Sequence, residues 1–348
     1  MIYINARFLT QSITGVQRYS LEISLQLKKL LPDVRFVTPH NIVQHEAAAA
    51  LGAEVIGSRT GHAWEQIDLP LFLKKNGSPL LVNLANTAPL FYRNKISTLH
   101  DIAFERFPEN FSWKFRKAYQ LATPWTIRTS LKVITVSEFS KREICEIYKT
   151  PPSKVVVVYN AVSELFQAQS KEAEEPYLLA VSSLNQQKNF HGLIGAFSLL
   201  KQNSHKLYIV GSLNKNFADP GLVKKIESDN RIKLLGRVSD EQLIDLYSGA
   251  AAFIYPSFYE GFGIPPLEAQ ACGCPVIVAN AASLPEVCGD SALYCDPRDI
   301  NDIADKIEQL ISTPALAQSL TEKGRANVAR FSWQASANGV LQVIREFQ

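Results

Sequence analysis

The chain has 348 residues, of which 46% are hydrophobic and 20% are charged, and its formal net charge is +3. This length exceeds the size at which a single hydrophobic core usually stops growing, so we expect two domains, and the composition excludes a disordered protein. The longest apolar runs are too short to span a bilayer as helices.

Charge is distributed unevenly along the chain. Basic residues outnumber acidic ones by 21 to 14 in residues 1–173, whereas acidic residues outnumber basic ones by 19 to 15 in residues 174–348. A basic first half is compatible with an anionic lipid surface or an acidic substrate, and equally with ordinary scatter. The five cysteines form no CxxC motif, so we expect free thiols in a reducing cytoplasm.

The first half of the chain alternates short apolar runs with helical segments. Its opening run, MIYINARFL, has no charged region and no cleavage site, so it predicts a buried strand and not a signal peptide. Residues 15–31 show the apolar spacing of a helix that ends before Pro32. Further strands, several apolar on both faces as in covered parallel sheets, are predicted at residues 34–39, 79–86, 96–103, 132–139 and 154–162.

Residues 111–132 interleave aromatic and basic side chains. The basic ones are Lys114, Arg116, Lys117, Arg128 and Lys132. This pattern suits a segment at the edge of a membrane. It suits equally a helix that packs on the first sheet and keeps its charges in water. Both interpretations remain open from the sequence. Nucleic acid is not expected, because no recognition helix or RNA-binding aromatic motif is present.

A polar stretch without apolar periodicity, residues 166–176, separates two strand–helix series. We therefore predict an N-terminal domain at residues 1–168, a linker at 169–176 and a C-terminal domain at 177–330. Residues 331–348 are predicted to form a helix that either completes the second domain or crosses back to the first. The strands of the second series are predicted at residues 177–184, 205–212, 232–238, 250–258, 274–280 and 291–297.

Helix starts are readable in the second series. Ser239 to Gln242 fits a capping box, and Asp299 precedes an apolar helical stripe. Two such series predict an α/β fold of two Rossmann-like, doubly wound parallel-sheet domains, with the ligand in a cleft between them.

The most informative stretch is FYEGFGIPPLEAQACGCPVIVAN, residues 258–280. Glu260 and Glu268 are separated by seven residues that include two glycines and two prolines. The glycines let the chain double back, and the prolines suit the first turn of a helix whose N-terminus attracts phosphate. We place Glu268 in that first turn. Carboxylates bind the hydroxyls of a sugar or ribose, so the stretch predicts a ligand that is part sugar and part phosphate.

These residues resemble the E-x7-E signature of the retaining glycosyltransferases of family 4, which have the two-domain GT-B fold. The resemblance covers most of the chain and follows the family's order: TGVQRY, LHD, TVSEFSK, YNAV, the Lys188–Asn189 pair, LYIVG, LLGRVSDEQL, YPSFYEGFGIPPLEAQACGCPVI and SLPEV. It is densest in residues 177–297.

The resemblance implies roles for the loop and the helix after it. Glu268 would hold the ribose hydroxyls of the nucleotide, and Glu260 would face the transferred sugar. The backbone N–H groups of Gly261, Phe262 and Gly263 would meet that sugar or the distal phosphate.

The resemblance also implies a cationic clamp on the diphosphate. Lys188 matches the family's lysine, but Ser183 stands where the family commonly has an arginine. One positive charge is therefore missing from the clamp that stabilises the leaving group. Either Ser183 and the backbone suffice, or another cation such as Arg237 contributes.

Three more positions are carried over from the family. His100 would contact the donor sugar and help to orient the acceptor, although a core histidine paired with Asp101 is the alternative. Gly15 opens the first long helix and would let the donor phosphates approach its N-terminus. The backbone of Val238 would contact the nucleobase.

The resemblance as a whole implies a hexosyltransferase that retains anomeric configuration and needs no metal or other cofactor. The donor would be a nucleoside diphosphate sugar, with GDP-mannose favoured. The acceptor would be a glycan or a lipid-linked oligosaccharide in surface polysaccharide biosynthesis (O-antigen or capsule), in the cytoplasm or at the inner face of its membrane. The alternatives are an epimerase or glucan synthase of the same fold, or a catalytically inactive nucleotide-sugar-binding partner of another transferase.

Overall fold

The computed structural model describes residues 1–169, 174–200, 204–211 and 220–348, and the chain divides into two compact units. Each unit is built on a parallel β-sheet with helices on its faces, so the predicted α/β class is confirmed. The first unit comprises Met1–Arg106, Phe111–Asn160 and Ser332–Gln348, and the second comprises Phe107–Asn110 and Ala161–Phe331.

The first unit contains a seven-stranded sheet in the order β3-β2-β1-β4-β5-β6-β7, with every described pair parallel. Its strands are β1 (Ile2–Asn5), β2 (Val34–Thr38), β3 (Glu54–Val55), β4 (Leu80–Asn83), β5 (Lys95–Thr98), β6 (Lys132–Thr135) and β7 (Val155–Val157). Its helices are α1 (Gly15–Leu30), α2 (His45–Leu51), α3 (Gly61–Ala63), α4 (Leu69–Lys75), α5 (Ala103–Arg106), α6 (Trp113–Thr129), α7 (Glu138–Tyr148) and α15 (Trp333–Arg345). Shorter turns are η1 (Arg7–Thr10), a π-helical turn η2 (Trp64–Asp68) and η4 (Pro152–Lys154).

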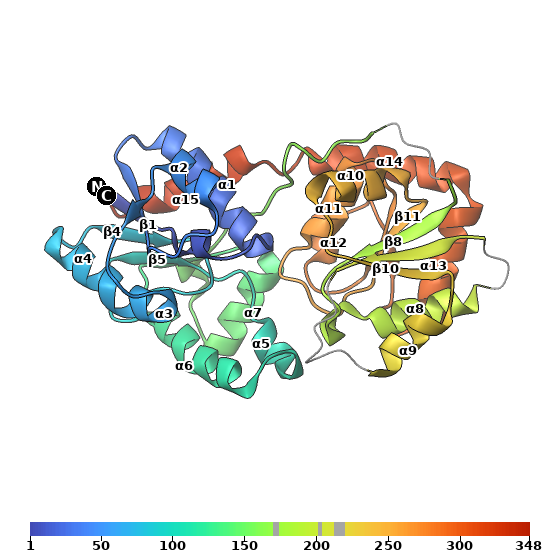
Figure 1. The fold of residues 1–348 in the computed structure, drawn as a ribbon, viewed down its shortest axis with the longest axis horizontal. Coiled ribbons are helices and arrows are strands. Elements are labelled where there is room, and N and C mark those ends of the chain that lie inside the picture. Colours follow the sequence, from blue (N-terminus) through green and yellow to red (C-terminus); the bar gives the residue numbers. More distant parts are fainter. Residues whose placement is uncertain (170–173, 201–203, 212–219) are drawn as a thin grey trace. The chain divides into compact units, whose positions relative to one another are not determined.

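Helices cover both faces of the first sheet. Figure 1 shows α1, α2 and α15 over one face and α3, α4 and α6 over the other. Alternate side chains of each strand therefore enter different apolar layers, which explains why the strands read as apolar on both faces. On the α4 side, Tyr3 and Leu81 of the sheet pack with Trp64 and Leu69.

The second unit contains a six-stranded parallel sheet in the order β10-β9-β8-β11-β12-β13. Its strands are β8 (Tyr177–Val181), β9 (Lys206–Val210), β10 (Ile232–Gly236), β11 (Ala252–Tyr255), β12 (Val276–Ala279) and β13 (Leu293–Cys295). Its helices are α8 (Phe190–Leu199), α9 (Pro220–Ser228), α10 (Asp240–Gly249), α11 (Ile264–Ala271), α12 (Leu284–Cys288), α13 (Ile300–Ser312) and α14 (Pro314–Val328). The 3-10 turns are η3 (Pro108–Asn110) and η5 (Gln186–Lys188).

Several local predictions can be compared with these elements. The capping box at Ser239 and Gln242 is present, and Asp299 caps α13 through two backbone N–H groups. The short edge strand β3 was not predicted, because its two residues are exposed and carry no apolar run. All five cysteines are free, as expected: Cys145, Cys272, Cys274, Cys288 and Cys295.

The boundary between the units lies earlier than residue 168. Residues 161–168 belong to the second unit, where the buried Phe166 packs against Tyr247 edge to face, with ring centroids 6.3 Å apart. Residues 170–173 of the predicted linker lie outside the described residues. The C-terminal helix α15 is part of the first unit, where it packs against α1, and Ser336 donates a hydrogen bond to the Tyr159 carbonyl.

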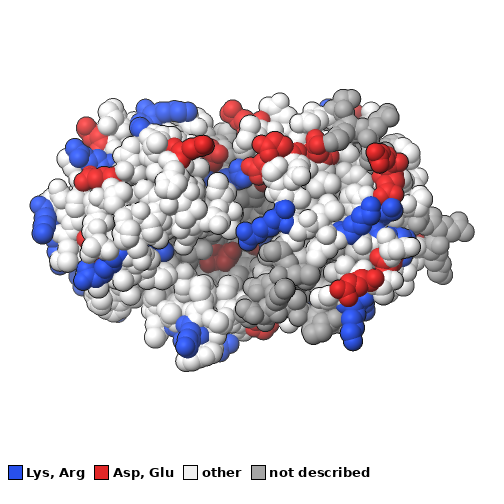
Figure 2. Space-filling model, viewed as in Figure 1, with Lys and Arg blue, Asp and Glu red and all other residues white. Residues whose placement is uncertain are grey.

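Within the described residues, no helix has both the length and the apolar character needed to cross a membrane. In Figure 2, basic and acidic side chains are interspersed on the face shown, over both units. Over the described residues, this face therefore has no continuous basic stripe of the kind that binds nucleic acid.

Candidate active site

The loop between β11 and α11 carries Glu260, and its conformation depends on Gly263 and Ser283. Gly263 caps α11 with a φ of 101°, and a Cβ there would lie 2.7 Å from Leu284 Cδ2. The positive φ favours glycine here, and any larger residue would also have to displace the Leu284 side chain. The buried Ser283 hydroxyl lies 2.9 Å from the Glu260 carbonyl and 2.8 Å from that of Phe262, so it ties the loop to the start of α12.

Lys188 and Glu260 form an ion pair in the second unit. The Lys188 ammonium lies 2.5 Å from Glu260 Oε1 and donates to the Tyr255 hydroxyl at 3.3 Å, and both charged side chains are about nine-tenths buried. Burial acts to lower the pKa of Lys188, but Glu260 and Tyr255 outweigh it and hold that pKa above its usual value. The structure thus brings two predicted site residues, 72 positions apart, into direct contact.

Glu268 lies further into α11 than predicted. The helix begins at Ile264, directly after the left-handed Gly263, so Glu268 is its fifth residue and lies beyond the first turn. Its carboxylate is buried and accepts a hydrogen bond from the Tyr247 hydroxyl at 3.2 Å. This partner fixes the carboxylate while leaving it further acceptor capacity for hydroxyl groups.

The loops after β8, β9 and β10 meet at the carboxyl end of the second sheet. Ser183 follows β8, is exposed and accepts a hydrogen bond from the Asn185 side chain at 3.1 Å. Gly211, which follows β9, donates to the Gly236 carbonyl at 2.8 Å, and a Cβ on it would lie 1.8 Å from the Ser182 carbonyl oxygen. Val238 lies two residues beyond Gly236. Sequence reasoning missed Gly211, although the LYIVG motif that ends in it was noted.

His100 lies in the first unit, just beyond the end of β5. Its Nε2 is 3.0 Å from the Leu84 carbonyl, which can only accept, so the ring proton is on Nε2 and Nδ1 carries the lone pair. Its backbone N–H donates to Asn86 Oδ1 at 2.8 Å, and its ring contacts Tyr19 edge to face. Burial lowers the pKa of His100 to about 4, so the ring is neutral near pH 7.

Gly15 is the first residue of α1 and is exposed. The same helix reaches the His100 neighbourhood, because Ser20 donates to the Leu84 carbonyl at 3.0 Å. Ser20 and His100 thus share the Leu84 carbonyl, and in the second unit Lys188 contacts Glu260. In the described part of the chain, no group of three or more His, Cys, Asp or Glu side chains could hold a metal ion.

Comparisons with known proteins give a consistent result. Residues 13–164 match Glycosyltransferase Family 4, and residues 162–327 match Glycosyl transferases group 1. The chain is 35% identical over 269 residues to O-antigen chain mannosyltransferase B of Escherichia coli, covering 73% of this chain and 70% of that protein. It is 31% identical over 246 residues to the O-antigen chain mannosyltransferase RfbU of Salmonella typhimurium, covering 71% and 69%.

The fold has close structural neighbours. The crystal structure of HepE from Anabaena in complex with UDP and glucose superimposes with a TM-score of 0.79 over 99% of both chains, at 19% sequence identity. At this identity the likeness concerns the fold alone, and it agrees with the two parallel-sheet units.

The buried His100 generates a prediction about pH. Its pKa is about 4 in the folded protein and about 6.5 when unfolded, so between these values the unfolded chain binds more protons and stability falls as the pH falls. This histidine should contribute about 2 kcal/mol of lost stability between pH 6.5 and pH 5. The free energy of unfolding, measured with urea across this window, should fall clearly less in His100→Gln than in the unsubstituted protein. The exposed His40→Gln is the control, and equal slopes for both variants would contradict a neutral buried imidazole.

Proposed function

The chain belongs to the family 4 glycosyltransferases, and we propose that it moves a hexose, with retention of anomeric configuration, from a nucleoside diphosphate sugar to a glycan or lipid-linked oligosaccharide. GDP-mannose is the favoured donor, and surface polysaccharide assembly is the favoured setting. The mannosyltransferase names of the two relatives support these finer assignments. The observation that carries the proposal is the buried pair of Lys188 and Glu260 beside the N-terminus of α11.

The pair suits a site for a sugar diphosphate. An ammonium group has three N–H donors, and that of Lys188 donates two hydrogen bonds, one to Glu260 and one to Tyr255. The third donor is available to a diphosphate oxygen, while Glu260 keeps a second oxygen for the hydroxyls of the transferred sugar. Negative charge develops on the diphosphate as the glycosidic bond breaks, and a fixed cation stabilises it without reorganisation.

The nucleotide end of the donor is assigned to the residues around it. Glu268, held by Tyr247, would bind the ribose hydroxyls, and the Val238 backbone would meet the base. The backbone N–H groups of Gly261, Phe262 and Gly263 would serve the sugar or the distal phosphate, because α11 adds the positive end of its dipole there. His100 and Gly15 of the first unit are assigned to the donor sugar and its phosphates.

We propose retention from the family resemblance, and the contacts of the two carboxylates bear on the route by which it occurs. Glu260 is held by Lys188 and Glu268 by Tyr247, so neither is placed as a free nucleophile on the sugar. The acceptor would then attack from the face of the leaving group, whose phosphate oxygen takes the acceptor proton. No step of this scheme calls for a metal or another cofactor, and we propose that the enzyme works without one.

Donor binding can be tested by thermal shift with UDP, GDP, ADP and TDP, because a ligand that binds the folded state raises the unfolding temperature. We expect GDP to give the largest shift. Glu268→Ala should weaken binding about tenfold or more by removing a charge-assisted hydrogen bond. The exposed helix carboxylate Glu308, changed to Ala, is the matched control. The absence of a shift with all four nucleotides would contradict the donor assignment.

Stereochemistry can be tested with GDP-α-mannose and an alkyl mannoside acceptor. We expect an α-linked product, identified by the one-bond carbon–hydrogen coupling at the new anomeric centre. Lys188→Met should lower kcat by about 100-fold, as expected when one fixed charge at the leaving group is lost. A β-linked product would overturn retention. If Glu260→Ala left transfer unchanged in a reconstituted complex, the chain would be an inactive partner of another transferase.

Membrane contact is part of the proposal. Trp113 on α6 is 68% exposed, Lys114 lies 5.8 Å from its ring centroid, and Lys117 follows one turn later. Tryptophan beside lysine suits the surface of an anionic bilayer, so we place the enzyme in the cytoplasm at the inner face of its membrane.

This contact predicts that the protein sediments with vesicles of phosphatidylcholine and phosphatidylglycerol more than with phosphatidylcholine alone. Trp113→Ser should reduce the bound fraction severalfold, since it removes the main apolar anchor. Leu165→Ser, at a similarly exposed apolar position of the second unit, should not. Equal binding to both kinds of vesicle would rule out this surface as an anionic lipid contact.

A further inference from the structure

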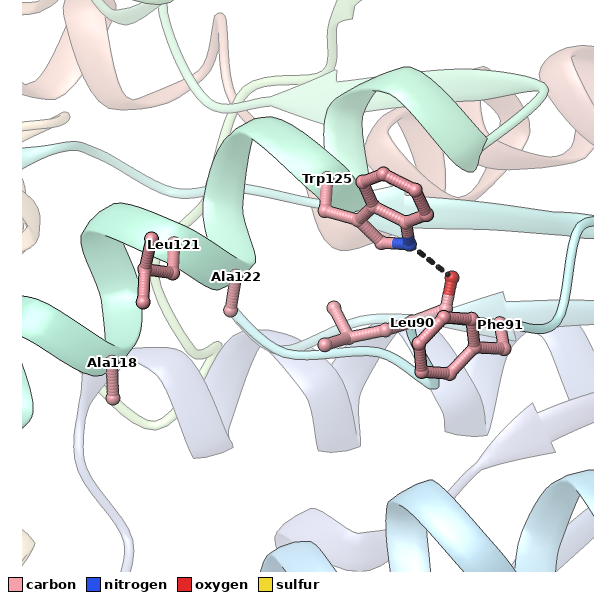
Figure 3. A pocket seen from close by; sticks show the side chains of 6 residues that line it. All are labelled: Leu90, Phe91, Ala118, Leu121, Ala122 and Trp125. Carbon is pink, nitrogen blue, oxygen red and sulfur yellow. Dashed lines mark hydrogen bonds between the residues drawn. The ribbon is translucent and has the colours of Figure 1, made fainter.

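One face of α6 and the loop after β4 form an apolar groove in the first unit. Figure 3 shows the side chains of α6 on one side and those of the loop on the other, with the Trp125 indole N–H donating to the Leu90 carbonyl at 3.1 Å. The cavity has a volume of about 300 Å³ and is lined by Leu90, Phe91, Ala118, Leu121, Ala122 and Trp125. Phe91 and Leu121 are 80% and 77% exposed, an unusual concentration of apolar surface in water.

The groove is built as a rigid element. The fully buried Lys95 donates to the Tyr92 carbonyl and to Thr129 Oγ1, both at 2.7 Å, so it ties the loop to the end of α6. Gln66 adds a second tie, because it accepts from the Leu90 N–H at 2.8 Å and donates to the Ala88 carbonyl at 3.0 Å. The apolar surface is therefore held open and preformed, as ligand sites usually are.

The groove continues into a cavity of different character. This second cavity, of about 280 Å³, shares Leu90, Ala118 and Ala122 with the first. It adds seven side chains with polar groups, those of His62, Gln66, Asn86, Thr87, Tyr119, Thr123 and Thr126. A single ligand lying along both would thus meet aliphatic and aromatic groups at one end and hydrogen-bonding groups at the other.

A buried carboxylate supports the polar end. Glu65, on the π-helical turn η2, is 1% exposed, and its Oε1 accepts from Asn5, Arg7 and Thr87. Among the described residues, its buried Oε2 has no hydrogen-bond partner, and His62 Nδ1 lies 3.6 Å from it. Glu65 thus places a buried negative charge next to His62 and Thr87, two of the residues that line the cavity. Burial tends to raise the pKa of Glu65, but His62, Arg7 and its other partners hold it below the usual value, so it is charged.

The polar end also adjoins a predicted site residue. Asn86 lines the cavity, and its side chain accepts the hydrogen bond from the His100 backbone N–H. A hydroxyl-bearing ligand at this end therefore lies close to the carboxyl end of the first sheet, where His100 stands.

Cations follow the same face of α6. Lys114 and Lys117 precede Ala118 and Leu121 by four residues each, and Arg128 follows Trp125 by three, so these charges border the groove. They complement an anionic group between the two ends of the ligand.

We propose that this groove binds an amphiphile with a sugar end, a phosphate and an aliphatic chain, the chemistry of a lipid-linked saccharide. The sugar hydroxyls bind at His62, Asn86 and Thr87, and the chain lies against Leu90, Leu121 and Trp125. This inference deepens the proposed function, because it names residues and a substrate class for its acceptor.

The test uses calorimetric titration of the full chain, without donor, with octyl α-mannoside below its micelle concentration and with methyl α-mannoside. Burying part of the chain should make the octyl compound bind at least about tenfold tighter. Leu121→Gln should reduce this advantage about fivefold, whereas His62→Ala should weaken both mannosides about threefold or more. Leu165→Gln and His40→Ala, at exposed positions outside the groove, are the matched controls. Octyl phosphate, which lacks the hydroxyls, should lose affinity in Lys117→Ala.

Equal affinity for the octyl and methyl compounds would overturn the proposal, and so would equal effects of Leu121→Gln and Leu165→Gln. Nucleoside diphosphate binding in the same variants separates this result from the donor assignment. If the nucleotides still bind while chain length has no effect, the groove is not an acceptor site and the proposed donor function stands.

Discussion

The buried contact between Lys188 and Glu260 is the interaction on which the second unit's site depends. Withdrawing two charges from water costs several kcal/mol for each, and their attraction offsets this cost only with good geometry and further hydrogen bonds. Tyr255 supplies one such bond, and the Phe258 N–H donates to the Gln187 carbonyl at 2.8 Å beside the pair. The pair therefore holds the β8 and β11 loops together, and removing either charge would strand the other in a nearly dry site.

The first unit uses the same device at its own sheet. Glu65 Oε1 lies 3.2 Å from Arg7 Nε and also accepts hydrogen bonds from the side chains of Asn5 and Thr87. Because Glu65 is buried, its charge needs these partners, since an unsatisfied charge there would be costly. The difference lies in what remains unsatisfied, because one oxygen of Glu65 has no hydrogen-bond partner among the described residues. Glu65 lies on a π-helical turn, a geometry that is frequent at functional sites.

Local signals in the sequence predicted the fold well, and contacts between distant residues explain what they missed. Apolar runs gave the strands, and the Ser239 cap could be read because its partner lies three residues away. Ser283 could not be read as the support of the Glu260 loop, because its partners are carbonyls 21 and 23 residues earlier. The network of Glu65 joins residues up to 80 positions apart, because Arg7 donates to Thr87 within it. The position of Glu268 was missed because the left-handed Gly263 starts α11 before the two prolines.

The arginine that is missing at Ser183 has one candidate replacement, Arg237, directly after β10. Gly211 lies against the Ser182 carbonyl and donates a hydrogen bond to the Gly236 carbonyl, so the loops after β8, β9 and β10 lie together. Arg237 is the residue after Gly236 and belongs to this group of loops. Arg237 is exposed and has no ion pair with any described residue, so its charge is not already neutralised. An arginine side chain is long enough to reach a phosphate from more than one backbone position. Its planar guanidinium group then presents several N–H donors to the phosphate. Arg237 therefore stays a candidate for the second cation of the proposed clamp, and it would come from the loop after β10 instead of the loop after β8.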